Sequence, residues 1–534
     1  MSNTPPLAKP EDAFTLAKLG YQQELRRNFS KYEIMSTAFT IIGLLPSIAS
    51  TLVFAIPAGP VGMVWGWFIA SSLTFIVSVA MADLGSAMPT AGGLYWWTHY
   101  FSAPAWKNPL AFLVGYSNTL GVIGGFCSTD YGFALMFLSV IQMAVGDNAK
   151  LPSNGIVYLV FLVCILSHAT VVTFASKIMA KLQVIFMIVN LLLIAVTIIV
   201  LPIGKKRTNS AEFVFTKSEN LSGWPPIWTF FLAWMCPIWS IGGFEACVHL
   251  SEEAKNATTA VPYGIMGSCG LSSILGLVVM AVFAACMPTD LNSLLNTPLG
   301  QPVAQIYLDA LGRHGAIVMM VLLCIAQWLM GVSVLVAGSR QSWAFSRDGA
   351  LPFSNYFSQI NKTFGYIPLR TVWGVSFICL VFGLLSLIAP ASAAALFSLG
   401  VAGNHLAWFM PIFARVVWGR DKFVPGPFYT GVWSIPIAVI TCVFLLFSIV
   451  TAMMPASGPH PTAKNMNYTV VINCAVWGGA LAYYYIDARK WFTGPKVTLD
   501  SASRSLLTVE DQEKIGKEAL VDIRDPEPPA YSAT

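Results

Sequence analysis

The sequence predicts an all-α membrane protein with twelve transmembrane helices. Of its 534 residues, 56% are hydrophobic and only 10% are charged, whereas soluble domains carry about 25% charged residues. So few charges cannot keep a large soluble surface hydrated, and lipid must therefore cover much of it. Along the chain, twelve apolar runs have roughly the 20 residues that one crossing of a bilayer core requires. The uneven distribution of Lys and Arg between the loops supports the same count.

The expected spans follow one another along most of the chain. Lipid offers no hydrogen bonds, so each span must satisfy its own backbone as a helix. The third span is longer than one crossing needs and is expected to tilt. We expect spans at 34–56, 62–82, 111–143, 155–175, 179–202, 227–250, 262–287, 315–338, 371–389, 393–417, 432–455 and 468–487.

The basic residues indicate how the chain is oriented. An even number of spans places both termini on one side, and 23 of the 30 Lys and Arg residues then lie on that side, against seven on the other. Cytoplasmic loops carry the excess of positive charge. Both termini are therefore expected in the cytoplasm, as an N-terminal tail over 1–33 and a C-terminal tail over 488–534 around a transporter domain over 34–487.

Several classes of protein are excluded by composition. The first 30 residues lack the apolar segment and cleavage site of a signal peptide. The net charge of +5 is spread through loops and does not indicate a nucleic-acid partner. The ten cysteines form no CxxC pair and mostly lie in apolar runs, which is typical of packing residues and not of a metal site. No nucleophile–base constellation indicates an enzyme, and no cofactor is expected.

Two spans contain helix-breaking residues in their middle. In the first span, Gly43 precedes Pro46, whose missing N–H and bulky ring disrupt a helix. The sixth span holds Pro237, a double glycine at 242–243 and the acid Glu245. Each break alone is equally compatible with an ordinary kink, which membrane helices tolerate.

The position of the two breaks favours a binding site. Spans one and six are matching members of two five-helix halves, and interrupted segments at corresponding positions point to a transport site near the bilayer midplane. Unwound backbone offers N–H groups for a carboxylate and carbonyls for an ammonium, which suits a zwitterionic amino acid. The predicted substrate-binding residues are Gly43, Leu44, Leu45, Ser47, Trp239, Ser240, Ile241, Gly242, Gly243, Phe244 and Glu245.

Long stretches of the chain resemble the fungal amino acid/choline transporter family, within the amino acid–polyamine–organocation superfamily. The stretches shared with the family are 89–97, 223–226, 237–249, 251–257, 261–262, 343–352 and 466–471. Four more, at 43–51, 201–204, 397–408 and 426–429, are closest to the fungal GABA permeases of that family. The likeness covers residues 20 to 495, nearly the whole chain.

The resemblance implies both an architecture and an activity. The architecture is a LeuT-like inverted repeat of five plus five helices (34–202 and 227–417) followed by two extra helices (432–487). The activity is secondary uptake of GABA or a related amino acid, driven by a proton gradient. A choline or polyamine permease of the same fold, or a sensor that no longer transports, are the alternatives, although the short tails favour a carrier. Relatives lie in the plasma membrane, which is the expected location, or in the vacuolar membrane.

The chain departs from superfamily patterns at residues that bear on proton coupling. Where some bacterial relatives have a proposed proton-coupling Lys, this chain has Asn190, which cannot titrate. The coupling candidates are therefore Glu245, Asp130, Lys181 and Asn190, since ionisable groups inside a membrane are functional hypotheses by default. Structural roles are the alternatives for Glu245 and Asp130, as packing is for Phe244, which by resemblance would be a gate over the substrate.

Three further features lie in loops and tails. Glu252 and Glu253 follow the sixth span and are expected to pair with basic loop residues such as Arg347. Both tails are expected to be mostly disordered, with some helical tendency. Pro528, Pro529 and Tyr531 form a Pro-Pro-x-Tyr motif that would recruit a WW-domain ubiquitin ligase. Asn220 begins an Asn-x-Ser sequon on the outer side and is the candidate glycosylation site.

Overall fold

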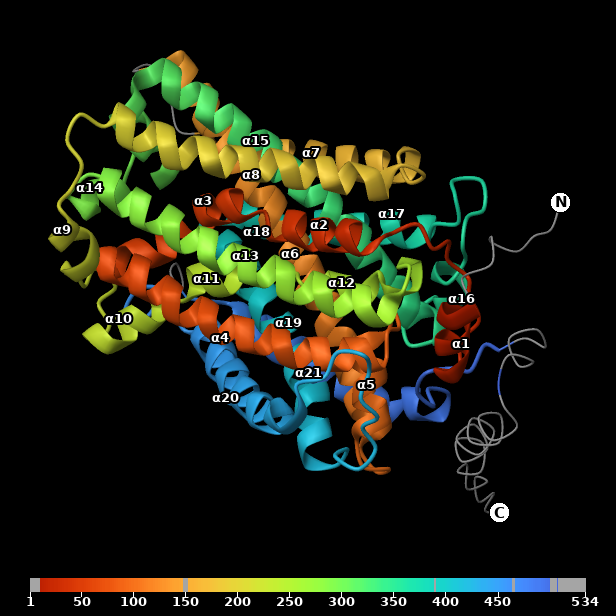
Figure 1. Ribbon diagram of the computed structural model, residues 1–534. Coiled ribbons are helices and arrows are strands. Elements are labelled where there is room, and N and C mark those ends of the chain that lie inside the picture. The colour runs from red at the N-terminus through yellow and green to blue at the C-terminus, as the bar shows by residue number, and fades with distance from the viewer. Residues whose placement is uncertain (1–9, 147–151, 389, 463–465, 500–506, 508–534) are drawn as a thin grey trace, which may run out of the picture.

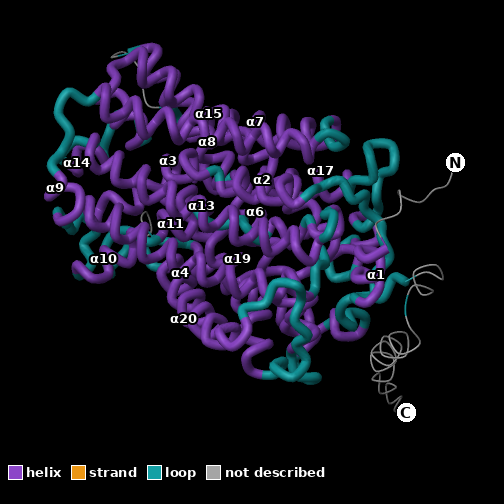
Figure 2. Tube along the Cα trace, in the orientation of Figure 1, coloured by secondary structure: helices purple, strands orange, loops and turns teal. Residues whose placement is uncertain are grey.

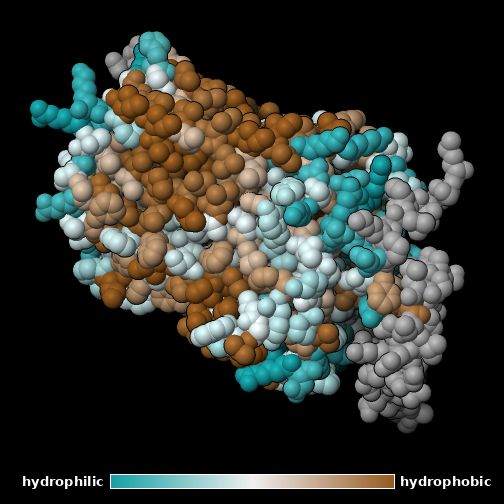
Figure 3. All heavy atoms as spheres, viewed as in Figure 1, coloured by the Kyte–Doolittle hydropathy of each residue, from teal (hydrophilic) through white to brown (hydrophobic). Residues whose placement is uncertain are grey.

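The computed structural model describes residues 10–146, 152–388, 390–462, 466–499 and 507. This part of the chain is helical and contains no strand beyond two isolated bridges (Figures 1 and 2). An apolar band crosses the helices, and hydrophilic residues gather towards the two ends of the molecule (Figure 3). The predicted all-α membrane protein is confirmed at this level.

The long helices fall where the sequence places the spans. The main ones are α2 (Lys31–Ile42), α3 (Leu44–Ala55), α4 (Gly59–Ala87), α6 (Lys107–Val145), α7 (Asn154–Phe174), α8 (Met179–Gly204), α13 (Ala257–Cys286), α15 (Pro302–Arg347), α17 (Leu369–Gly383), α19 (Pro390–Val417), α20 (Ser434–Met453) and α21 (Thr469–Ile486).

One helix is much longer than predicted. We expected a span at 315–338, but α15 has 46 residues, with a non-helical Gly312 near its start. Its last two turns are buried although they carry Arg340 and Arg347. The hydropathy of the sequence placed the end of this span too early, because it treats the two arginines as residues in water. In the structure they lie inside the protein, each with a partner.

Ten helical stretches, not twelve, are long and apolar enough to cross a membrane within the described residues. Two features account for the difference. Residues Lys31–Ala87 count as one stretch of 57 residues, more than twice the length of about 20 residues that one crossing requires. The sixth expected span is divided into short helices, α10 (Pro226–Ala233), α11 (Met235–Ser240) and α12 (Ala246–His249), each too short to count. Twelve crossings and the inverted repeat therefore stay predictions.

The close contact between α6 and α19 depends on glycines. An added Cβ at Gly124 would lie 2.8 Å from the backbone nitrogen of Gly400, and one at Gly403 would lie 2.8 Å from Gly121. No side chain fits between the two backbones at these points. Helix α6 also contacts α15 and α7, so it holds the centre of the molecule together.

The N-terminal segment differs from its prediction. We expected it to be mostly disordered with some helical tendency, but it forms α1 (Pro10–Lys18), and Leu16, Tyr21 and Leu25 are buried. Phe29 forms a backbone bridge with Ala254, and Ser30 with Glu33 forms a capping box at the start of α2. Composition missed this segment, because its contacts are few and specific and not a continuous apolar face.

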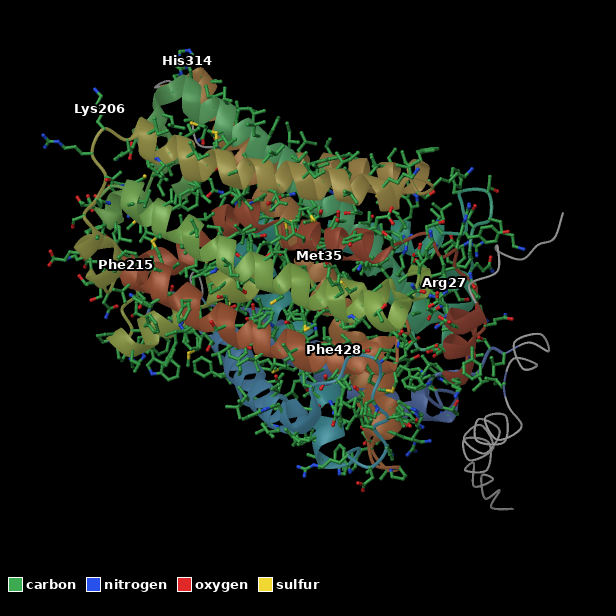
Figure 4. The ribbon with its side chains drawn as sticks, in the orientation of Figure 1. Arg27, Met35, Lys206, Phe215, His314 and Phe428 are labelled. Atoms are coloured by element: carbon green, nitrogen blue, oxygen red, sulfur yellow. The ribbon has the colours of Figure 1, made fainter. Side chains whose placement is uncertain are left out.

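Charged residues that the sequence assigns to opposite sides lie at opposite ends of the molecule. Arg27 is at one end, and Lys206 is at the other, where the neutral His314 also lies (Figure 4). The two described ends of the chain also meet, since Thr498 N–H donates to the carbonyl of Gly20 at 2.8 Å. Which compartment each end faces stays a prediction.

Candidate functional site

The first break lies at Gly43, as predicted. Helix α2 ends at Ile42, and Gly43 has φ 46° and ψ 58°, the left-handed conformation that glycine adopts without strain. Its missing side chain also makes room for α15, because a Cβ there would lie 2.7 Å from Met330 Sδ. Pro46 falls in the first turn of α3, where a missing N–H costs no helical hydrogen bond.

The second break lies between α11 and α12. Residues 241–245 form turns, and Gly243 has φ 93°. A Cβ at Gly243 would lie 2.4 Å from Ile41 Cγ2 in the last turn of α2. The two broken segments therefore touch, although about 200 residues of sequence separate them.

A cavity opens beside this contact. Its walls come from α2, α6, α15, α19 and the broken sixth segment. The residues that matter below are Ile41, Gly125, Thr129, Trp239, Gly242, Gly243, Glu245, His249, Met330, Asn404, His405 and Trp408.

Glu245 is the one acidic side chain on the cavity wall within the described residues. It is 3% exposed, and its Oε2 has no hydrogen-bond partner among those residues. A buried acceptor without a donor costs about 1–3 kcal/mol, and more when it is charged. The cavity therefore fits a ligand that brings an N–H donor, best of all a cation.

Asn404 supplies an opposite kind of polar group. Its Oδ1 accepts a hydrogen bond from Asn118 Nδ2 at 3.2 Å. This leaves the NH₂ end of the Asn404 amide as a donor on the wall. His405 lies on the same helix and contacts Ser448 through Nδ1 at 2.5 Å.

The structure brings only part of the predicted set to the cavity. Trp239, Gly242, Gly243 and Glu245 line it. Ser240 instead lies 3.2 Å from the Thr51 hydroxyl, Ile241 is buried, and Phe244 packs on Trp408 with ring centroids 4.7 Å apart. Gly43, Leu44, Leu45 and Ser47 are buried beside the cavity and are not among its lining residues. Binding by these residues stays a prediction.

Sequence reasoning missed the walls contributed by α6, α15 and α19. Gly125, Thr129, Met330 and Asn404 carry no local signal of a site. The adjacent glycines 124 and 125 are the best available signal of a site. Gly124 contacts α19, and Gly125 faces open space.

The coupling candidates fall in different environments. Asp130 is fully buried and lies 3.3 Å from His168 Nδ1. Asn190 is also buried, with Nδ2 donating to the carbonyl of Phe186 at 3.0 Å and Oδ1 without a partner among the described residues. Lys181 is exposed near the start of α8. Proton coupling through any of them stays a prediction.

A set of ion pairs closes the molecule at the end that holds the chain termini. Arg347 donates to both oxygens of Glu252, at 2.9 and 3.1 Å, which confirms the predicted pairing. Glu253 pairs with Arg340 at 2.8 Å, a partner that the sequence did not indicate. Burial alone raises the pKa of Glu252, but Arg347 and the hydrogen bonds from Ala91 and Thr90 together hold that pKa below its ordinary value. We call these two pairs the inner latch.

The N-terminal segment covers the inner latch. Tyr21 stacks its ring under the Arg347 guanidinium, 4.0 Å away, and donates its hydroxyl to Asp348 at 2.9 Å. Tyr95 donates to the same carboxylate at 2.7 Å. Burial, and then the nearby Asp348, raise the pKa of Tyr21 well above its ordinary value, so it stays a donor. Arg347 of the inner latch thus contacts Glu252 through its ion pair and Tyr21 of the N-terminal segment through its ring.

Two predicted features lie at the edges of the molecule. Asn220 is exposed, and its Nδ2 donates to the carbonyl of Trp224 at 2.7 Å. The Pro-Pro-x-Tyr motif of Pro528, Pro529 and Tyr531 lies outside the described residues. Both features stay predictions.

Comparisons with known proteins place the chain among amino acid carriers. The family model described as amino acid permease matches residues 32–477. The chain is 41% identical to the GABA-specific permease of Saccharomyces cerevisiae, over 91% of this chain and 86% of that protein. It is 33% identical to an uncharacterized amino-acid permease of Schizosaccharomyces pombe, over 92% and 89%, and 29% identical to amino-acid permease BAT1 of Arabidopsis thaliana, over 90% and 95%.

A solved structure shows that the fold is shared more widely. A manganese transporter of Eremococcus coleocola aligns with a TM-score of 0.53 at 14% identity, over 91% of this chain and 98% of that one. At that identity the likeness concerns the fold alone.

Proposed function

Because the chain belongs to the amino acid permease family of secondary transporters, we propose that it carries 4-aminobutyrate (GABA) together with protons across a membrane by alternating access. The observation that carries this proposal is the unpaired Oε2 of Glu245, which has no partner among the described residues and lies on the cavity wall. A primary ammonium offers that oxygen both charge and an N–H donor. The 41% identity to a GABA-specific permease supports the choice of substrate.

The two ends of GABA require opposite partners. We place the ammonium at Glu245. The carboxylate would lie against the first-turn N–H groups of α3, which lack acceptors within their own helix, with the Asn404 amide as a second donor. Trp239 and Trp408 would cover the methylene chain, because both line the cavity.

Choline and polyamines are the rival substrates. Trp239 and Trp408 on the cavity wall favour a quaternary ammonium, which binds to aromatic faces. Choline, however, has no N–H to donate to Glu245, and it has no carboxylate for the α3 terminus. A polyamine would satisfy Glu245 but would bring a second cation to a wall with one acid.

The experiment is uptake of labelled GABA by proteoliposomes that contain the purified protein. We expect accumulation with an inward proton gradient, inhibition by excess GABA and weak inhibition by choline and putrescine. Stronger inhibition by choline or putrescine than by GABA would show that GABA is not the preferred substrate. Binding of GABA without any flux would indicate a sensor. GABA flux that is unchanged by a protonophore would contradict proton coupling.

Gly125 is expected to set the size limit of the substrate. A Cβ at Gly125 would meet nothing within 4 Å, and this residue faces the cavity. Gly125→Leu should fill that space and lower GABA uptake by about tenfold or more, the scale at which a pocket discriminates small apolar groups. Gly478→Leu is the matched control, since it is also helical with open space around it but lies on the outer surface of α21. Equal uptake by both variants would contradict the placement of the substrate.

The location and the regulation of the protein are proposed on sequence grounds. We place it in the plasma membrane, with the vacuolar membrane as the alternative, and both termini in the cytoplasm. A glycan on Asn220 would require its Nδ2 to leave the carbonyl of Trp224. Pro528, Pro529 and Tyr531 would bind a WW-domain ubiquitin ligase.

A further inference from the structure

A carboxylate and an imidazole lie together inside the membrane domain, outside the substrate cavity. Asp130 of α6 and His168 of α7 are both 0% exposed, and their nearest polar atoms are 3.3 Å apart. Among the described residues, His168 is the one basic side chain within 4 Å of this carboxylate. Leaving a carboxylate charged and unpaired at such depth is expensive, so one proton shared with His168 stabilises the site.

The surroundings of the pair are thiols and aromatic rings. Cys164 of α7 lies 3.7 Å from Asp130 and 3.9 Å from His168. Within the described residues, Cys324 of α15 faces Cys164, and Cys379 of α17 faces both Asp130 and Cys127 of α6. Phe126 and Trp328 flank the imidazole, with ring centroids at 5.8 and 5.2 Å. A neutral thiol does not compete for a proton near neutral pH.

Two helices connect the pair to the substrate cavity through adjacent residues. Thr129, which lines the cavity, immediately precedes Asp130 in α6. In α15, Met330 lines the cavity and abuts Gly43, while a Cβ on the next residue, Gly331, would lie 2.3 Å from His168 and 2.8 Å from Asp130. A change in the pair therefore reaches the cavity wall and the first break within one residue on each helix.

The turn of α6 that holds Asp130 also meets the first broken span. Gly132, two residues after Asp130, lies against the outer half of the first span, where its Cβ would be 2.6 Å from Ser50 Oγ. Gln327 of α15 donates to the carbonyl of Thr129 at 2.8 Å, so it ties the same turn of α6 to α15. The outer half of the first span, α6 and α15 thus meet around this pair.

We propose that Asp130 and His168 form the binding site for the transported proton, with Glu245 left to the substrate. This inference rests on the proposed function. Without the proton, the pair is a carboxylate and a neutral imidazole with a net charge of −1. One proton from water binds at the imidazole and makes the pair neutral, and the same proton leaves to water on the other side. The neutral pair is the form whose burial costs least during the conformational change.

The test separates proton-driven accumulation from exchange. For a carrier that moves one proton per GABA, a gradient of one pH unit sustains about tenfold accumulation, since one unit corresponds to 1.36 kcal/mol. Asp130→Asn should reduce this ratio to about 1 and abolish GABA-dependent proton uptake. Its counterflow of labelled GABA against unlabelled GABA, with no gradient, should stay within about twofold of the wild type, because exchange needs no net proton movement.

The controls assign each failure to its cause. Asp309→Asn, on an exposed position of α15, should accumulate GABA like the wild type. An Asp130→Asn protein that still accumulates GABA tenfold overturns the inference. If that variant shows no counterflow, His168→Gln decides: loss of accumulation supports the pair, and wild-type accumulation overturns it. A wild-type protein that exchanges GABA but ignores the proton gradient overturns the inference and leaves GABA recognition intact. If GABA is not the substrate, the wild-type protein itself shows neither accumulation nor counterflow of GABA.

Discussion

Glu245→Gln is expected to weaken GABA binding by roughly 30-fold to 4,000-fold. Removing one partner of a buried, hydrogen-bonded charge pair costs about 2–5 kcal/mol, and 1.4 kcal/mol corresponds to a factor of ten. The amide keeps the shape of the side chain but loses the charge that attracts the ammonium. Because Oε2 has no other partner among the described residues, no protein group there compensates for the substrate.

The measurement is equilibrium binding of labelled GABA to the purified variant. Glu212→Gln is the matched control, since Glu212 is exposed in the short helix α9 (Ala211–Thr216). Thermal unfolding of both variants checks that the fold is retained. An affinity within about threefold of the wild type would rule out an ion pair with the substrate at Glu245, because that change is under 1 kcal/mol.

Breaking the inner latch is expected to open the molecule at the end that holds the chain termini. Glu252→Gln leaves the buried Arg347 without its anion, and loss of one partner of a buried pair costs about 3–5 kcal/mol. Glu252 also accepts from Thr90 Oγ1 at 3.1 Å and from the Ala91 N–H at 3.0 Å. Losing the charge should therefore loosen the three segments that meet at this carboxylate and shift the population towards a state that is open at this end.

Thiol labelling detects this opening. Cys247 in α12 is buried, whereas Cys474 is exposed and Cys442 is half-buried, so the assay needs a background in which both of these are replaced by Ser. Glu252→Gln should raise the labelling rate of Cys247 by at least tenfold, since a shift of only about 1.4 kcal/mol already changes a population tenfold. Arg420→Ala, at an exposed position, is the control. An unchanged rate at Cys247 would show that the pair does not hold the closed state.

The latch is also expected to persist in mild acid. Arg347 holds the pKa of Glu252 below the ordinary value of 4.5. A carboxylate with a lowered pKa in the folded state contributes stability at pH values above its unfolded pKa, and that stability is lost as the pH falls through the folded pKa. The labelling rate of Cys247 in the wild type, divided at each pH by the rate of a free thiol to remove the titration of the thiol itself, should therefore stay constant from pH 7 down to about pH 5.

Periodicity and composition predicted the helices well, because lipid imposes one physical rule on every span. Pro46 and the glycines at 43 and 242–243 marked both breaks for the same reason, since backbone conformation is a local property. The Glu252–Arg347 pair of the inner latch could also be predicted, because the charges and their positions in loops can be read from the sequence.

The rest depends on contacts that no local pattern encodes. His168 reads as one polar residue in an apolar helix, and only tertiary packing places it on Asp130. Gly125 differs from Gly124 in nothing but the direction it faces. Likewise, hydropathy cannot tell that Arg340 lies against Glu253, and so it ended α15 too early.

The contact between the two chain ends bears on how the protein is prepared. Lys496 N–H donates to Asp348 at 3.3 Å, and Thr498 N–H donates to Gly20. Asp348 in turn holds Tyr21, which lies under Arg347. A chain truncated after residue 495 would lose both contacts, whereas one truncated after residue 499 would keep them. Affinity tags and fluorescent fusions therefore belong beyond residue 507, because Leu507 is also buried, at 6% exposed.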